Sequence, residues 1–130
     1  MADYVLDTHA CLFALAAPQK LGSKARRALE QAPVRSGTVW VPAAVSAEIV
    51  MLKQLGRTDL GVPALRLAFE RAGWRFLALD FEQIDEFAAL GAIRDPFDRL
   101  IVAASRRTGA KLISRDSNLE ELGLVDIVWA

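Results

Sequence analysis

The sequence has little of what a disulfide-stabilised, zinc-binding or membrane-spanning protein needs. Its 130 residues include one cysteine and one histidine, which excludes an internal disulfide and a Cys/His zinc site. Its apolar runs are shorter than the ~18–20 residues that cross a bilayer, and Asp3 stands where a signal peptide would carry a basic residue. We therefore expect a cytoplasmic protein without a membrane partner, in which oxygen atoms hold any bound metal.

An excess of charge of either sign is also absent. Lys+Arg and Asp+Glu are 16 each, so the net charge is zero, and a nucleic-acid substrate would need local basic patches. Hydrophobic residues make up 53% of the chain and the mean hydropathy is +0.24, which argues against disorder. We expect a single domain over residues 1–130, with some of its apolar surplus covering a partner.

Short β-rich segments alternate along the chain with longer segments of helical period. Strands are predicted at residues 4–7, 38–42, 74–79, 111–116 and 126–130, and helices at 9–17, 21–32, 43–56, 62–73, 81–91 and 95–109, with Ser23 capping the second helix. This alternation predicts an α/β fold, a three-layer α/β/α sandwich with a mainly parallel central sheet. In such sheets, functional sites form at the carboxyl ends of the strands.

Several acidic residues fall where such a site is expected. Asp7 ends the first strand, and capping of the following helix explains it equally well. Asp116 ends the strand at 111–116. Because Ser117 and Glu120 already form a capping box, we predict that Asp116 is free for another role. Glu48 lies inside the apolar stripe of its helix, so its charge is not simply solvated.

Asp98, in the segment DPFDRLIVAA, is the most informative acid. Asp95 and Pro96 are explained as the N-cap and the first position of a helix. Asp98 shares a face with Ile101 and Val102, and burial of an unpaired carboxylate there costs several kcal/mol. The helix dipole returns only about 0.3–1 kcal/mol. A cation, either an arginine or a metal ion, must therefore meet Asp98.

A single metal site explains four of these acids, Asp7, Glu48, Asp98 and Asp116. Four carboxylates brought together repel one another and their pKa values rise, and a divalent cation removes the conflict. Ligands that are all oxygen suit Mg²⁺ or Mn²⁺. Such ions polarise phosphoryl oxygens and lower the pKa of a bound water. We therefore expect hydrolysis of phosphodiesters by a metal-bound water.

Four segments, in this order and with this spacing, resemble the PIN-domain ribonucleases, and most closely the VapC-type toxins of bacterial toxin–antitoxin pairs. They are VLDTHACLFAL, VSAEIVMLKQLGR, DPFDRLIVAAS and LISRD, and the resemblance covers essentially the whole chain. It implies a PIN-like fold and a Mg²⁺- or Mn²⁺-dependent endoribonuclease. By the same resemblance, Asp7, Glu48, Asp98 and Asp116 are its catalytic metal ligands, and cleavage leaves a 5′-phosphate and a 3′-hydroxyl.

The resemblance also suggests supporting residues. Asp95 is a supporting position, and Thr8 and Ser46 match hydroxyl positions that orient water or a ligand, although helix capping explains both equally well. Arg99 either contacts phosphate or pairs with a neighbouring acid, and pairing is favoured. His9 is expected to be structural, because a hydroxide bound to a metal needs no separate general base.

The resemblance further implies partners. A cognate VapB-like antitoxin is expected to place its C-terminal segment in a groove between helices, here the helices over residues 44–73, and a second copy of the chain is expected to form a homodimer. Transfer, ribosomal and messenger RNA all stay open as substrates. Trp40, Trp74 and Trp129 are expected in the core or at the dimer interface rather than as platforms for RNA bases.

Two other classes of function stay open. A phosphotransfer domain of the response-regulator or haloacid-dehalogenase kind also gathers acids around Mg²⁺. It requires an acidic pair or Asp-x-Asp after the first strand, where this chain has Asp7-Thr8-His9, and the response-regulator kind requires a lysine after a late strand, whereas Lys111 begins its strand. A catalytically silent PIN-like binding or scaffold module usually lacks some of the four acids, all of which are present here. An active nuclease is therefore favoured.

Overall fold

A five-stranded sheet with the order β3-β2-β1-β4-β5 forms the centre of the computed structural model, which describes residues 2–130. The strands are β1 (Tyr4–Leu6), β2 (Val39–Pro42), β3 (Arg75–Leu77), β4 (Lys111–Ile113) and β5 (Ile127–Val128). Each neighbouring pair is parallel. The prediction of a mainly parallel sheet is confirmed, and the sheet is parallel throughout.

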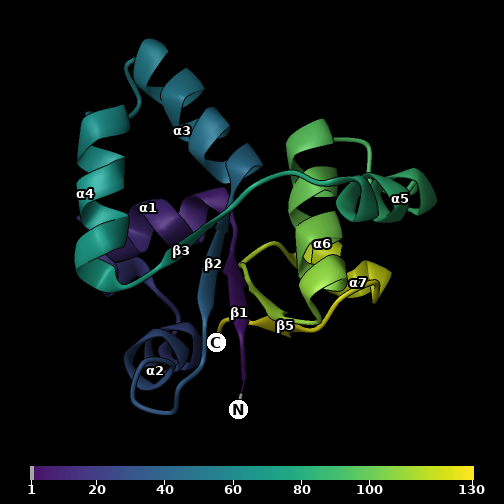
Figure 1. The fold of residues 1–130 in the computed structure, drawn as a ribbon, viewed down its shortest axis with the longest axis horizontal. Helices are drawn as coiled ribbons and strands as arrows, with labels where there is room; N and C mark the ends of the chain where they lie inside the picture. Colours follow the sequence, from purple (N-terminus) through teal and green to yellow (C-terminus); the bar gives the residue numbers. More distant parts are fainter. Residues whose placement is uncertain (1) are drawn as a thin grey trace.

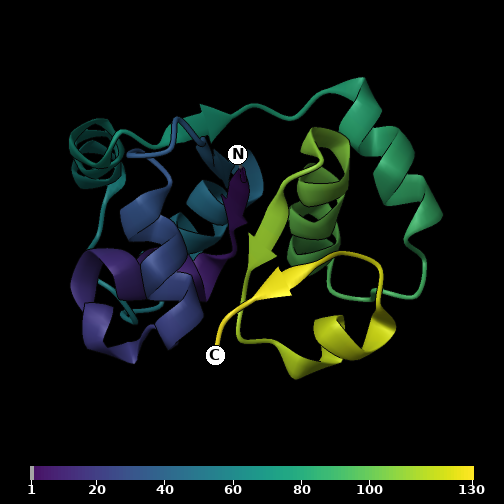
Figure 2. The ribbon, with the colours of Figure 1, turned by 90° about the horizontal axis from the view of Figure 1, so that it is seen from below.

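Helices cover both faces of this sheet. Within residues 2–130 they are α1 (Thr8–Ala16), η1 (Pro18–Lys20, a 3₁₀ turn), α2 (Ser23–Gln31), α3 (Ala43–Gln54), α4 (Val62–Ala72), α5 (Phe81–Ala89), α6 (Pro96–Thr108) and α7 (Ser117–Leu122). Helices α1, α2 and α4 lie on one side of the strands, and α5, α6 and α7 lie on the other (Figures 1 and 2). The predicted three-layer α/β/α sandwich is confirmed.

The central strands consist of consecutive apolar residues because both of their faces are covered. Val5, Leu6, Val41, Leu112 and Ile113 are all 0% exposed, and burial of each side chain contributes about 1.5–3 kcal/mol. Helix α6 lies against β1 and β4 and is buried over the run from residue 101 to residue 105. The three tryptophans are half-buried against this core, as expected.

The two edge strands and one helix start differ from the predictions. Strands β3 and β5 are shorter than predicted, because the flanking residues lie beyond their single hydrogen-bonded neighbour. The prediction that Ser23 caps α2 is wrong, since Gly22 is the N-cap. A Cβ on Gly22 would lie 2.2 Å from the carbonyl oxygen of Trp129, which accepts a hydrogen bond from the Ala25 amide. Glycine therefore lets the C-terminal segment dock on α2.

The strand order also locates a cleft. The chain moves outward from β1 to β2 and β3, and then crosses to β4 on the other side of β1. Helix α3 begins directly after β2 and contacts both α1 and α6 above the sheet. Ligands of open α/β sheets bind at the carboxyl edge where the direction of winding changes, which is here the edge of β1 and β4. Within residues 2–130, no helix is long and apolar enough to cross a bilayer.

Candidate active site

A cavity of about 470 Å³ opens at this carboxyl edge. Asp7 directly follows β1, Asp116 comes shortly after β4, Glu48 projects from α3 and Asp98 from the first turn of α6. The cavity is lined by Asp7, Thr8, His9, Glu48, Asp95, Asp98, Arg115, Asp116 and Ser117. The structure thus brings together all four acids that the sequence suggested as a cluster.

Asp7 serves the fold and the cavity together. It is the N-cap of α1, and its Oδ1 accepts a hydrogen bond of 2.8 Å from the Ala10 amide. Burial raises the pKa of Asp7 and the nearby Asp116 adds to the rise, while hydrogen bonds from Ser114 and Ala10 oppose it. One carboxylate therefore caps α1 and also lines the cavity.

Thr8 holds the acid of α3. Its Oγ1 donates a hydrogen bond to Oε1 of Glu48, which lies 40 residues further along the chain. Thr8 is only 3% exposed, so this bond lies in a poorly solvated place where a charge-assisted bond is strong. The hydroxyl of Thr8 therefore orients a cavity acid.

Asp98 is half-buried, and its pKa is raised to about 6. The largest cause is burial, followed by repulsion from Asp95, Asp116, Glu48 and Asp7. The Asp98 amide donates a 3.0 Å hydrogen bond to Oδ1 of Asp95, the N-cap of α6, as predicted. The side chain of Asp95 thereby fixes the turn that carries Asp98.

No arginine neutralises these acids in the part of the chain that the structure describes. The ion pairs of residues 2–130 are Arg106 with Glu86 at 2.8 Å and Arg107 with Asp80 at 4.0 Å, both outside the cavity. The sequence predicted that either an arginine or a metal ion meets Asp98. No ion pair between Asp98 and an arginine is present among the described residues. The raised pKa values of Asp7 and Asp98 are what uncompensated carboxylates show.

The predicted capping box after Asp116 is wrong. Asp116 itself is the N-cap of α7, because its Oδ1 accepts hydrogen bonds from the amides of Asn118 at 2.9 Å and Leu119 at 3.2 Å. Ser117 is the first helical residue instead. An aspartate caps a helix as well as a serine does, so the helix starts one position earlier than predicted. Asp116 still lines the cavity.

Two of the predicted supporting residues lie outside the cavity. Arg99 Nε donates to the carbonyl of Phe87 at 2.9 Å, and its guanidinium lies 4.2 Å from the centroid of the Phe87 ring. The favoured pairing of Arg99 with an acid is therefore wrong. Ser46 faces a groove between α3 and α4, where its buried hydroxyl has no hydrogen-bond partner among the described residues.

The sequence did not single out Arg115, gave Ser117 only a capping role and assigned His9 to structure, yet all three line the cavity. His9 and Arg115 are both exposed at the rim. Arg115 could have been predicted at the cavity from its position in the sequence, because it directly precedes Asp116 at the end of a central strand.

The residues present suit a hard divalent cation. Within residues 2–130, no group of three or more Asp, Glu, His or Cys side chains is arranged so that it could hold a metal ion together. Mg²⁺ does not require such a cage, because it keeps several waters and binds directly through one or two carboxylates. The cavity is lined by five carboxylates and the hydroxyl of Thr8, and no ion pair within residues 2–130 neutralises these acids, so it offers the oxygen donors and the charge for such an ion.

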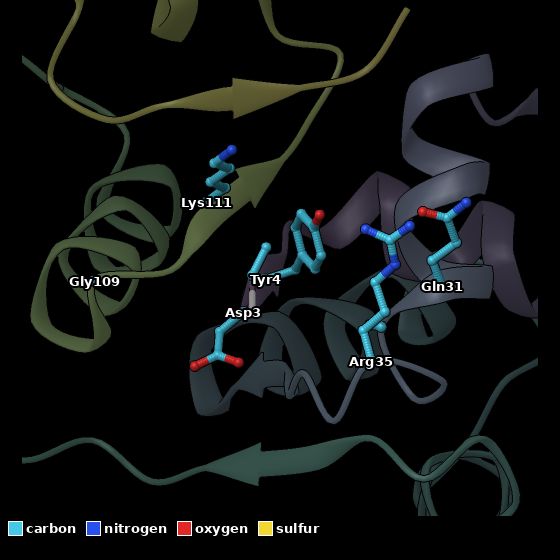
Figure 3. Close-up of a pocket in the computed structure, with 8 residues that line it drawn as sticks. Asp3, Tyr4, Gln31, Arg35, Gly109 and Lys111 are labelled. Atoms are coloured by element: carbon cyan, nitrogen blue, oxygen red, sulfur yellow. The ribbon is translucent and has the colours of Figure 1, made fainter.

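A second cavity, of about 540 Å³, opens at the opposite end of the strands. It is lined by residues that include Asp3, Tyr4, Arg35 and Lys111, and Figure 3 shows that the carboxylate of Asp3 and the guanidinium of Arg35 point in different directions. Oδ1 of Asp3 accepts a hydrogen bond from the Thr38 amide. With one engaged carboxylate and no second acid, this cavity lacks a catalytic arrangement.

The chain matches a known protein family over most of its length. A model of the PIN domain matches residues 4–124. The chain belongs to the PIN domain family. PIN domains are generally nucleases and typically use divalent metals, which agrees with the acidic cavity. A comparison with curated protein sequences finds no match.

Solved structures share the fold of this PIN domain. VapBC2 from Rickettsia felis, bound to a promoter DNA fragment, matches with a TM-score of 0.73 and 15% identity over 98% of each chain. FitAcB from Neisseria gonorrhoeae matches with 0.65 and 17% over 95% of each. A toxin–antitoxin complex from Klebsiella pneumoniae matches with 0.61 and 17% over 88% of each.

Proposed function

We propose that this PIN domain is a Mg²⁺- or Mn²⁺-dependent endoribonuclease and the toxin of a toxin–antitoxin pair. The observation that carries the proposal is the convergence of four carboxylates, from four separate segments, on one cavity without a neutralising arginine. Membership of a family of nucleases supports it. Structural neighbours that are toxin–antitoxin complexes support the toxin role.

In this proposal Asp7, Glu48, Asp98 and Asp116 hold the metal ion. When bound, the ion polarises a phosphoryl oxygen and lowers the pKa of a water molecule. The chain's own groups prepare the site: Thr8 orients Glu48, and Asp95 fixes the first turn of α6. Binding of a cation favours the ionised form of Asp98, whose pKa is otherwise raised. The expected products carry a 5′-phosphate and a 3′-hydroxyl.

The antitoxin is proposed to bind the groove between α3 and α4, which lies within the helices suggested by the sequence. This groove has a volume of about 660 Å³, and its lining includes Val50, Val62, Leu65 and Phe69 together with Trp74. An amphipathic segment could place apolar side chains in such a groove.

A homodimer is proposed as the assembly state. Three apolar side chains on the segment after β3 and at the start of α5 are exposed: Leu79 by 48%, Phe81 by 85% and Ile84 by 38%. A contiguous exposed apolar patch is typical of a contact surface, and these side chains are proposed to form part of one. A second copy that covered them would also extend the surface available to RNA.

The proposal is tested by incubating the purified protein with total RNA in Mg²⁺ or Mn²⁺, with EDTA and D98N as controls, and mapping the fragment ends. Discrete cuts that require both the metal and Asp98, and that leave 5′-phosphates, are the expected result and identify the RNA target. An intact fold by circular dichroism without cleavage in either metal would refute the nuclease and favour a catalytically silent binding or scaffold module.

A further inference from the structure

Two cationic side chains lie over the ring of Phe13, on α1, beside the acidic cavity. The guanidinium carbon of Arg115 lies 4.8 Å from the ring centroid and Nζ of Lys20 lies 5.6 Å from it. Trp129 and His9 flank the same ring, with centroids 6.3 Å and 6.1 Å away. Cations within about 6 Å of an aromatic centroid are attracted to the ring. Phe13 therefore anchors positive charge at the rim of the site.

Arg115 is the more informative of the two cations. It lines the same cavity as five carboxylates and directly precedes one of them, Asp116, in the chain. Yet no ion pair joins it to any acid within residues 2–130. An exposed arginine beside uncompensated carboxylates would ordinarily turn toward them. Its contact with Phe13 instead leaves the guanidinium exposed and its five N–H donors without protein acceptors in the described residues.

We propose that Arg115 binds a phosphate of the RNA strand that enters the acidic cavity, and that Phe13 is the positioning residue that keeps this guanidinium away from the carboxylates. The proposal rests on the nuclease function proposed above. An acidic cavity repels RNA, and a chain with a net charge of zero gives no compensating attraction, so positive charge is needed at the rim. A guanidinium there can bind phosphate with two parallel hydrogen bonds.

The first test measures binding without cleavage. A fluorescent single-stranded RNA carrying the mapped cleavage sequence is titrated with D98N protein by fluorescence anisotropy, and R115A, R115K and F13L are added to that background. R35A is the matched control, because Arg35 is an exposed arginine in the cavity at the opposite end of the strands. Circular dichroism of each variant checks folding, and F13M serves as a second aliphatic variant should F13L be misfolded.

The expected results separate the two residues. R115A should bind about tenfold more weakly, as loss of one charge-assisted hydrogen-bonded contact predicts. Its slope of log affinity against log salt should be less steep by about 0.7, the value for one phosphate of a single strand. R115K should bind with intermediate affinity, since lysine lacks the planar fork. F13L should bind about threefold more weakly, and R35A should bind normally.

Kinetics with Asp98 intact complete the test. R115A should raise KM with little change in kcat, the signature of lost uniform binding. A lower kcat at unchanged KM, or binding and cleavage equal to wild type, would overturn the role of Arg115 while leaving the nuclease in place. Unchanged binding by F13L would overturn the positioning role of Phe13. Absence of cleavage by the wild-type protein would instead refute the proposed function itself, so the two failures are distinguishable.

Discussion

Thr8, at the start of α1, donates its hydroxyl hydrogen to Oε1 of Glu48, in the middle of α3. The bond joins the segment after β1 to the helix after β2 directly at the acidic cavity. Thr8, which its place at the start of a helix would explain by itself, therefore also orients the carboxylate of Glu48. A test of this role should therefore remove the hydroxyl of Thr8 and keep the shape of its side chain.

Substitution T8V keeps the branched shape and removes the hydroxyl. It should lower the free energy of unfolding by about 1–3 kcal/mol, because it leaves a carboxylate oxygen without its donor. It should also raise the Mg²⁺ concentration needed for RNA cleavage by about tenfold. T8S, which retains the hydroxyl, is the control in urea denaturation and in the cleavage assay. Equal metal requirements for T8V and T8S would contradict the orienting role.

Asp116 caps α7 and is proposed to hold the metal ion, and two substitutions can separate these roles. Asparagine caps a helix as well as aspartate does, so D116N should keep the wild-type stability, while D116A should lose about 1 kcal/mol in urea denaturation. Both variants should lose RNA cleavage, because neither supplies a carboxylate. Cleavage by D116N at the wild-type rate would show that Asp116 acts only as the N-cap.

The raised pKa of Asp98 determines whether its contribution to stability rises or falls with pH. Its pKa is about 6 in the folded protein and ~3.9 in an unfolded chain. The folded state therefore binds more protons between these values, so without metal this group's contribution to stability falls as pH rises through that window. In EDTA at pH 7.5, D98N should have a higher Tm than wild type, and the difference should shrink toward pH 4. A Tm advantage of D98N that grew on acidification would contradict this assignment.

The groove between α3 and α4 can be tested without disturbing the core. Val62 is 48% exposed, lines the groove and is the first residue of α4, where a glutamate is favourable for the helix dipole. V62E should weaken binding of a co-expressed antitoxin by at least about tenfold and leave RNA cleavage unchanged. L67E is the control, since Leu67 is 45% exposed on α4 and does not line the groove. Equal antitoxin binding by V62E and wild type would exclude this groove.

The proposed dimer surface is tested at its most exposed residue. Phe81 is 85% exposed at the start of α5, and F81E should convert the dimer to a monomer in size-exclusion chromatography with light scattering. V34E is the control, because Val34 is 83% exposed in the loop after α2. A dimer retained by F81E would place the interface elsewhere.

Local patterns were sufficient to predict the layers and to predict which acids line one cavity. The continuous apolar character of the central strands indicated burial on both faces, and the strand ends indicated where Asp7 and Asp116 lie. Asp98 was identified because its charge conflicts with the apolar face that it shares. These inferences depend on residues near one another in sequence, which is why they succeeded.

Features set by contacts between distant segments could not be predicted. The Gly22 cap of α2 depends on the close approach of Trp129, over 100 residues away. Arg99 turns to the Phe87 carbonyl rather than to an acid, because α5 packs against α6. The Phe13–Arg115 contact likewise requires the start of the chain to lie beside the end of β4. Sequence periodicity contains no information on such pairs.

Cys11, the one thiol of the chain, lies a single turn beyond Asp7, and its amide donates to the Asp7 carbonyl. Burial and the nearby Asp7 charge raise the pKa of this thiol to about 12, so almost no reactive thiolate exists at neutral pH while α1 is in place. Alkylation of Cys11 then requires α1 to open. The rate of labelling therefore measures how often α1 opens next to the acid cluster. Labelling of Cys11 with and without Mg²⁺ would therefore report whether the proposed cation suppresses this opening.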